Sequence, residues 1–198
     1  MRVIQVCVGR SRAARIGDRS FMTAFAKRAV DGPAAVRPLG LEGDEQADLS
    51  VHGGLAKAVY AYPQEHYAFW QTVRAQAGVA PWDEPLPPGS LGENLLLQGL
   101  LEDQLWIGDR LRIGHPASDA GCVLAVSEPR LPCFKFGAAM GFVQATRLMH
   151  QSGWCGAYLA VLQAGTVQAG DAIELVPGPR EVNLRELFRK RAPGGPGR

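Results

Sequence analysis

The residues best suited to chemistry surround Cys133, in the segment SEPRLPCFK. Pro129 and Pro132 keep the chain extended before the cysteine, which predicts a rigid loop at the end of a strand. Arg130 and Lys135 flank the thiol, and nearby cations favour the thiolate, the form that attacks electrophiles or ligates a soft metal. Cys133 is therefore a candidate catalytic residue and metal ligand. The alternative is a buried cysteine that acts as a small apolar residue.

A glycine-rich segment upstream has the composition of a phosphate site. His52, Gly53 and Gly54 are followed closely by Lys57. Tight turns at the glycines would offer backbone amides beside a cation, which suits an anion. The alternative is a pair of ordinary turns with a solvated lysine. The acidic residues at 42–48 do not have the spacing of a calcium loop, so we assign no metal to them.

A third segment, GSLGENLLLQGL, places Glu93 and Asn94 directly before an apolar strand. A carboxylate acceptor and a side-chain amide at that position are able to hydrogen-bond the edge of a nitrogen heterocycle. The alternative is that these two residues only stabilise a turn. Trp154, in the glycine-bounded loop SGWCG, is the aromatic residue that we expect to form a pocket wall.

Short apolar runs between Gly, Pro and Asp breaks predict the strands that position these residues. Such spacing favours a sheet that closes on itself. The segments LEDQLWIGDRLRIG and LAVLQAGTVQAGDAIELV are each interpreted as a hairpin, because a Gly-Asp pair precedes the second run. The expected strands are Val3–Val8, Ala34–Leu41, Ala58–Tyr62, Asn94–Leu97, Leu105–Ile107, Arg110–Ile113, Cys122–Val126 and Ile173–Val176.

Helices are expected in three places. PQEHYAFWQTVRAQAG begins with a proline in the first turn and ends at Gly78, and MGFVQATRLMHQSG has helical spacing of its apolar residues. A basic helix is expected over Val182–Arg191, followed by a disordered Gly/Pro tail. The Pro-rich stretch between Gln76 and Ser90 is expected to be irregular.

Composition limits the class of protein. The chain has 198 residues, of which 46% are hydrophobic and 20% charged. It is long enough for one sizeable core, and its apolar runs are too short to cross a bilayer. A net charge of +2, concentrated near the end of the chain, argues against dedicated nucleic-acid binding. Four widely spaced cysteines and the lack of a signal-peptide pattern predict a cytoplasmic protein with reduced thiols.

Taken together, the three segments resemble the MOSC family, and specifically its YiiM-like branch. The resemblance rests on LGLEGDEQAD, VHGG, KAVYAYP, GSLGENL and PRLPCFK in this order, with GDRLRIG between the last two. It extends over most of the chain. We accordingly expect a mostly β, barrel-like MOSC domain at residues 1–177. Residues 178–198 would be a short basic helix and tail, the remnant of a larger helical region in YiiM-like proteins.

The resemblance implies a molybdenum cofactor (molybdopterin) whose metal is ligated by Cys133. It also implies reduction of N-hydroxylated compounds such as hydroxylamino base analogues, with electrons from a partner reductase. By chemical type, Arg130, His52 and Lys57 would neutralise the pterin phosphate or the metal-oxo group, while Glu93 and Asn94 orient the ring. Pyridoxal phosphate binding is included only because it is associated with the wider family. A homodimer is possible.

Three alternatives remain at this stage. Cys133 could carry a persulfide as a sulfur carrier. The chain could bind or deliver the cofactor without catalysis. A cysteine hydrolase using Cys133 and His52 is a weaker alternative, because nothing in the sequence places this histidine beside the thiol.

Overall fold

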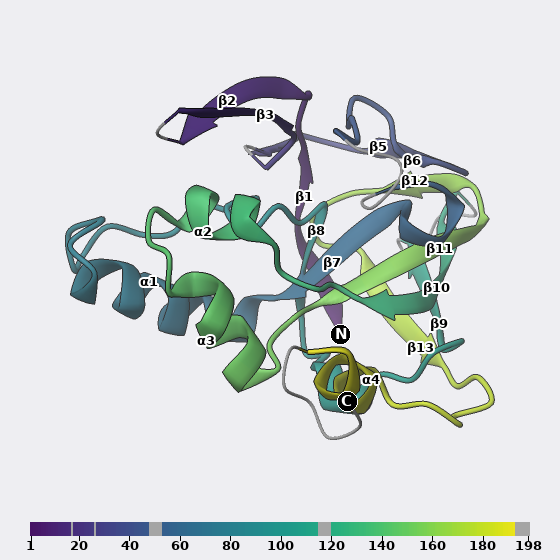
Figure 1. Cartoon of the computed structure of the whole chain (residues 1–198). Helices are drawn as coiled ribbons and strands as arrows, with labels where there is room; N and C mark the ends of the chain where they lie inside the picture. The colour runs from purple at the N-terminus through teal and green to yellow at the C-terminus, as the bar shows by residue number, and fades with distance from the viewer. Residues whose placement is uncertain (17, 26, 48–52, 115–119, 193–198) are drawn as a thin grey trace.

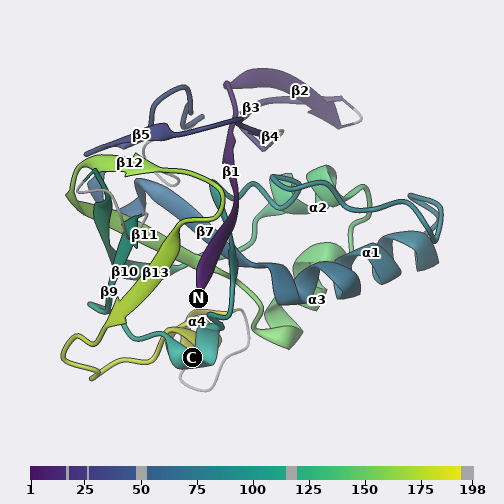
Figure 2. The same cartoon turned by 180° about the vertical axis from the view of Figure 1, so that it is seen from behind.

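The chain closes a seven-stranded barrel, seen from two sides in Figures 1 and 2. It is described here from a computed structural model covering residues 1–16, 18–25, 27–47, 53–114 and 120–192. The strand order is β13-β9-β10-β11-β7-β8-β1, and Arg2 of β1 then pairs with Ala172 of β13. The predicted mostly β barrel is confirmed. Its strands are β1 (Arg2–Val8), β7 (Val59–Pro63), β8 (Leu95–Gln98), β9 (Arg110–Gly114), β10 (Cys122–Pro129), β11 (Ala157–Gln163) and β13 (Ala172–Val176).

Alternation of apolar and polar residues explains which faces point inward. In β9, Leu111 and Ile113 are buried while Arg110 and Arg112 are exposed, as expected for a strand with one solvated face. All five residues of β7 are buried instead, because helices cover the outside of this part of the barrel. The barrel interior is filled by aliphatic side chains, among them Val3, Val6, Leu111, Leu124 and Leu159.

The neighbours β7 and β8 are parallel, with Ala61 opposite Leu95. Parallel strands need a crossover connection, and here it contains a 3-10 turn (Gln64–His66), the helix α1 (Tyr67–Gln76) and an irregular Pro-rich return. The helix and the irregular stretch are both as predicted. Trp70 on α1 is fully buried and anchors the crossover.

Two short helices, α2 (Phe134–Met140) and α3 (Ala145–Ser152), connect β10 to β11. They pack with α1 beside the barrel (Figure 1) in a second apolar cluster that contains Trp70, Phe136, Met140 and Met149. We expected one helix here. The break comes at Gly141, whose φ of 83° ends α2 in a left-handed cap.

A hairpin that the sequence did not predict, β2 (Arg12–Ile16) with β3 (Arg19–Thr23), stands off the barrel above α2. Its first strand is exposed or half-buried throughout, so it lacks the apolar alternation by which strands are recognised. The expected strand Ala34–Leu41 is divided into β5 (Ala34–Arg37) and β6 (Gly40–Leu41), which form a small sheet with β12 (Gly165–Val167). The two-residue strand β4 (Arg28–Ala29) pairs with β1.

Both predicted hairpins are wrong. In the first, residues Glu102–Gln104 form a 3-10 turn, and the expected strand Leu105–Ile107 makes a single bridge from Trp106 to Asn183. In the second, β11 pairs with β10 and β7, whereas β13 pairs with β9 and β1. Barrel closure places each strand beside partners that are remote in sequence.

The last element, α4 (Leu184–Arg191), confirms the predicted basic helix. The side chain of Asn183 caps it by accepting hydrogen bonds from the amides of Arg185 and Glu186 at 3.0 and 3.2 Å. Leu184 and Phe188 are fully buried, so the helix is docked on the barrel. The predicted tail at 193–198 lies outside the described residues, and the domain boundary after residue 177 stays a prediction. Within the described chain, no helix has the length and apolar character to span a bilayer.

Candidate functional site

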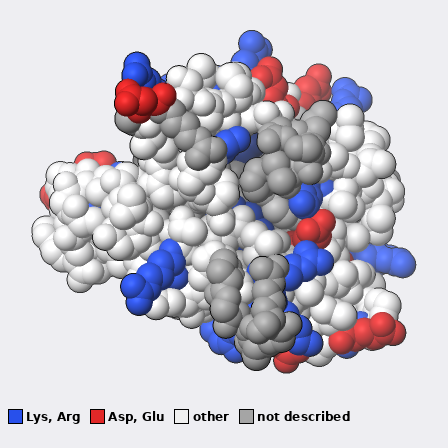
Figure 3. All heavy atoms as spheres, in the orientation of Figure 1, with Lys and Arg blue, Asp and Glu red and all other residues white. Residues whose placement is uncertain are grey.

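A pocket of about 90 Å³ lies where β7, β10 and β11 meet the start of α2. Its wall includes Lys57, Tyr60, Arg130, Lys135 and Tyr158. Three of these are cations: Lys57 comes from one segment of the chain, and Arg130 and Lys135 come from the segment around Cys133. Basic atoms are visible along a hollow on this face (Figure 3). The fold thus brings Lys57 and Arg130 together, as the sequence predicted.

Arg130 is the most unusual residue of the pocket, because it is a cation with only 3% of its surface exposed. Its guanidinium lies over the rings of Phe25, Tyr60 and Phe136, at 5.0, 5.5 and 4.6 Å from their centroids. Aromatic faces attract a cation. Among the described residues, no carboxylate forms an ion pair with it. A buried cation without an acidic partner gives the pocket a positive potential suited to an anion.

Cys133 is half-buried at the N-terminus of α2, whereas Cys7, Cys122 and Cys155 are buried. Burial raises the pKa of Cys7 and of Cys122 to about 12, and it raises the pKa of Cys155 as well. Those three stay protonated at neutral pH, and Cys133 is the cysteine that solvent and ligands reach.

The thiol of Cys133 borders the pocket rather than lining it. Arg130 and Lys135, which precede and follow Cys133 in the chain, both line the pocket. Burial raises the pKa of Tyr158, another residue of the wall. The hydrogen bond and charge of Arg130 act on Tyr158 in the opposite direction. Tyr158 therefore lies beside the buried cation in the pocket wall, a position that its sequence context gave no sign of.

Further cations of the pocket have acidic neighbours. Lys57 lies 3.8 Å from Glu128 and 5.8 Å from the ring centroid of Tyr158. Lys27, which the sequence analysis did not select, forms a buried ion pair with Asp44. These pairs fix the two lysines at the pocket edge.

Glu93 and Asn94 have their polar groups engaged within the protein. Glu93 is fully buried and accepts hydrogen bonds from the amides of Gly89 and Leu91 and from the hydroxyl of Tyr67. Burial raises its pKa, and these hydrogen bonds lower it. Glu93 thus shapes the turn before β8, and this arrangement differs from the ring-binding role expected from sequence.

Asn94 connects two strands. Its side-chain oxygen accepts from the amide of Tyr60 at 3.1 Å, and its side-chain nitrogen donates to the carbonyl of Cys7 at 3.2 Å. It also forms part of the pocket wall. We therefore assign Asn94 a positioning role, holding β7 against β1.

The expected phosphate nest is partly described. Gly54 has a φ of 78°, and its amide donates to the side chain of Gln46 at 2.9 Å. Gly53 also has a positive φ, of 145°. The turn geometry agrees with the prediction, but one of its amides is used by the protein itself. His52 lies outside the described residues.

A larger groove of about 500 Å³ adjoins the pocket. We call it the hairpin groove, since it lies between the β2–β3 hairpin, α2 and residues 84–90. Pocket and groove share Thr23, Phe25, Lys27 and Lys135. The hairpin touches the start of α2 through an edge contact of Phe21 with Phe134, at 5.2 Å between ring centroids.

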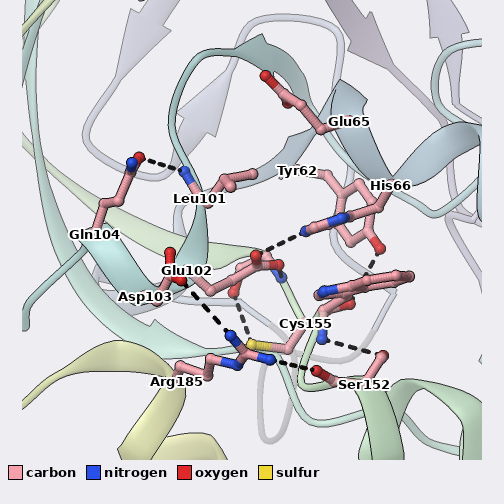
Figure 4. Close-up of polar contacts among 12 residues, drawn as sticks. Tyr62, Glu65, His66, Leu101, Glu102, Asp103, Gln104, Ser152, Cys155 and Arg185 are labelled. Carbon is pink, nitrogen blue, oxygen red and sulfur yellow. Dashed lines mark hydrogen bonds and ion pairs between the residues drawn. The ribbon is translucent and has the colours of Figure 1, made fainter.

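A separate polar cluster lies below α1 (Figure 4). His66 and Glu102 are 2.8 Å apart, and the amide of Gly156 donates to the same carboxylate at 2.8 Å. His66 also stacks on Trp154, with 4.4 Å between ring centroids. Trp154 lines neither the pocket nor the hairpin groove, and its place in a pocket wall stays a prediction. The cluster fastens the start of α1 to the turn before β11.

Comparison with known proteins identifies the family. The MOSC domain matches residues 48–174. The chain belongs to the MOSC family. Protein YiiM of Escherichia coli is 36% identical to this MOSC protein over 167 residues, which cover 83% of the chain and 68% of YiiM. The crystal structure of YiiM from Geobacillus stearothermophilus superposes with a TM-score of 0.72 at 27% identity, covering 96% of this chain and 82% of that one.

A more distant relationship bears on activity. A protein named reductase from Gibberella moniliformis is 31% identical over 193 residues, covering 96% of the MOSC protein but 32% of that longer relative. The resemblance to YiiM-like MOSC proteins and the barrel are thus confirmed. The relationship supports a MOSC-family function.

Proposed function

We propose that this MOSC protein binds molybdenum cofactor, with Cys133 as the protein ligand of the metal, and reduces N-hydroxylated compounds. The observation that carries the proposal is that the accessible Cys133 lies in the chain between Arg130 and Lys135, which both line the pocket. Arg130 is a buried cation that has no acidic partner among the described residues. A soft ligand and an anion site stand together there. The relative named reductase agrees with a redox role.

The donor set fits a metal that arrives in an organic chelate. In the described part of the chain, no three His, Cys, Asp or Glu side chains converge on one point. A metal at Cys133 would therefore bring most of its ligands with it. Thiolate sulfur suits a soft metal centre, and the cations Arg130 and Lys57 suit the phosphate of a pterin.

The residues of the chain have distinct tasks in this proposal. Cys133 holds the metal, and Arg130 and Lys57 hold the anionic part of the cofactor. When bound, the cofactor supplies the two-electron redox chemistry. Tyr158 keeps its proton at neutral pH because its pKa is raised, so its hydroxyl is suited to donate a hydrogen bond to a substrate oxygen. Conversion of an N–OH group to N–H consumes two electrons and two protons and releases water. The electrons would come from a partner reductase, in the cytosol, where free cysteines stay reduced.

The decisive experiment measures molybdenum and pterin in protein purified from a host that makes the cofactor. We expect the molybdenum content and the pterin content of Cys133→Ala to be at least tenfold lower, with its thermal unfolding unchanged. Cys122→Ala is the matched control, because that cysteine is buried in the barrel and the same atoms are removed. Full metal occupancy in Cys133→Ala would exclude the assignment.

The same preparations separate the other interpretations. An accessible Cys133 would also suit a sulfur carrier, which would release sulfur on cyanide treatment and contain no metal. A cofactor-delivery protein would hold molybdenum but fail to reduce an N-hydroxylated purine with an artificial electron donor.

A further inference from the structure

The hairpin groove is larger than the neighbouring pocket, and the proposed function does not use it. Its volume of about 500 Å³ lies within the range of roughly 300–1,000 Å³ that is usual for small-molecule sites. It opens beside the pocket, because Phe25, Lys27 and Lys135 belong to both walls. A molecule in the groove would therefore reach the chemistry at Cys133 from one side.

Basic side chains outnumber acidic ones in the lining of the groove. Arg12, Arg74 and Lys135 line it, together with Arg15 and the paired Lys27, whereas Glu84 is the single acid among its lining residues. Arg15 is neutralised locally by Asp18, at 3.1 Å. Among the described residues, Arg12 and Lys135 form no ion pair. The groove thus has basic groups in excess of the acids that would balance them.

Its other walls are apolar. Phe21 of the hairpin, the buried Leu86 and the buried Met140 of α2 face the same cavity. Arg74 is positioned by a hydrogen bond from its Nε to the carbonyl of Met140, at 3.4 Å, which leaves its terminal N–H groups to face other acceptors. Apolar walls with basic groups beside them match an elongated molecule that has a flat apolar body and an anionic group.

We propose that the hairpin groove is the substrate subsite and that it selects purine substrates in their 5′-phosphorylated, nucleotide form over the free nucleoside. The inference rests on the proposed function for the identity of the purine body. The basic lining of the groove is the reason to expect a phosphate on the substrate. Arg12 and Arg74 hold the phosphate, and Phe21, Leu86 and Met140 enclose the flat base. Arg12 and Arg74 are specificity-determining residues, because they act on a part of the substrate remote from the reacting nitrogen.

The test is a calorimetric titration of adenosine 5′-monophosphate and of adenosine into the full chain, free of cofactor. We expect the nucleotide to bind at least tenfold more tightly, with an advantage that shrinks as salt is raised, because screening weakens charge interactions. Arg12→Gln together with Arg74→Gln should bring the nucleotide down to the affinity of the nucleoside. Arg12→Lys should keep most of the preference. Phe21→Ser should weaken both ligands by a similar factor.

Arg110→Gln is the matched control, since Arg110 is exposed on β9 and lines neither cavity. It removes one positive charge and should leave both affinities unchanged. Equal affinity for nucleotide and nucleoside, or no binding of either, would overturn the inference.

A second arm uses cofactor-loaded protein. Nucleotide binding should persist there, because the residues proposed to hold the cofactor, Cys133, Arg130 and Lys57, do not line the groove. Loss of nucleotide binding on loading would mean that the groove holds part of the cofactor itself, and the inference would fall. Because the first arm needs no metal, a failure of the molybdenum assignment would be seen separately, as metal retained by Cys133→Ala.

Discussion

The guanidinium of Arg130 lies 4.6 Å from the centroid of the Phe136 ring, in the cluster that joins α2 to the pocket. The charge is surrounded by aromatic faces in place of a carboxylate. Such a residue contributes little to folding compared with an apolar side chain of similar size. Its position is better explained by binding than by stability.

Arg130→Met should therefore separate binding from folding. We expect the thermal midpoint to stay equal or to rise, because the methionine removes a buried charge while filling similar space. Molybdenum and pterin content should fall at least tenfold. Metal analysis and calorimetry check the two effects, and a variant that unfolds readily yet keeps its metal would contradict this interpretation.

The thiols should differ sharply in reactivity. The chain has four free cysteines, of which only Cys133 is not buried. A chromogenic disulfide reagent at pH 8 should therefore react rapidly with one thiol, and with the other three only in denaturant. Thiolate is the reactive form, and the raised pKa of about 12 protects Cys7 and Cys122. Cys133→Ser should abolish the rapid phase. A rapid phase that survives would show that another cysteine is accessible.

Removal of the Asn94 side chain should destabilise the barrel. The amide of Tyr60 and the carbonyl of Cys7 would each lose a buried partner, at about 1–3 kcal/mol for a group left unsatisfied. Denaturant unfolding of Asn94→Ala should show a loss of about 2 kcal/mol or more. Gln98→Ala, at the end of the strand β8 that follows Asn94, is the control, since its bond to Arg2 is exposed and its loss should cost under about 0.5 kcal/mol.

Acidification should loosen the contact between α3 and α4. His150 stacks on Phe188 at 5.5 Å, and burial lowers its pKa below 6.5. A group whose pKa is depressed by folding stabilises the fold above its unfolded pKa, and this contribution is lost as pH falls through the folded pKa. The thermal midpoint should thus decrease as the pH is lowered below 6.5. His150→Phe should remove this component and raise the midpoint, because the Nδ1 atom is buried without a partner among the described residues. If the thermal midpoint of His150→Phe depended on pH in the same way as that of the unaltered protein, the assignment of this pH dependence to His150 would be contradicted.

Sequence patterns predicted the barrel strands and α1 because these depend on local periodicity. Leu111 and Ile113 alternate with arginines. In α1, Tyr67, Trp70 and Val73 recur at the spacing of a helical turn. Pairing partners were mistaken where closure brings remote strands together, as for β11 and β13.

The same limit applies to the site. Residue type selected Cys133, Lys57 and Arg130 as candidates, and the fold places Lys57 and Arg130 in one pocket wall. The rings around Arg130 come from three distant segments, so no local pattern could have revealed them. For Glu93 and Asn94, residue type gave the capacity to hydrogen-bond, but only the fold decides that the partners are backbone groups of the protein.

The parallel pairing of β7 with β8 also has a consequence for how this molecule can diversify. It forces a long crossover, and one wall of the hairpin groove is formed by that excursion, while another is formed by the insertion after β10. Neither insertion contributes a strand to the barrel. Changes of length or composition in the crossover can alter ligand preference while leaving the strand register in place, and Cys133 as well, because it lies after β10 and outside the crossover.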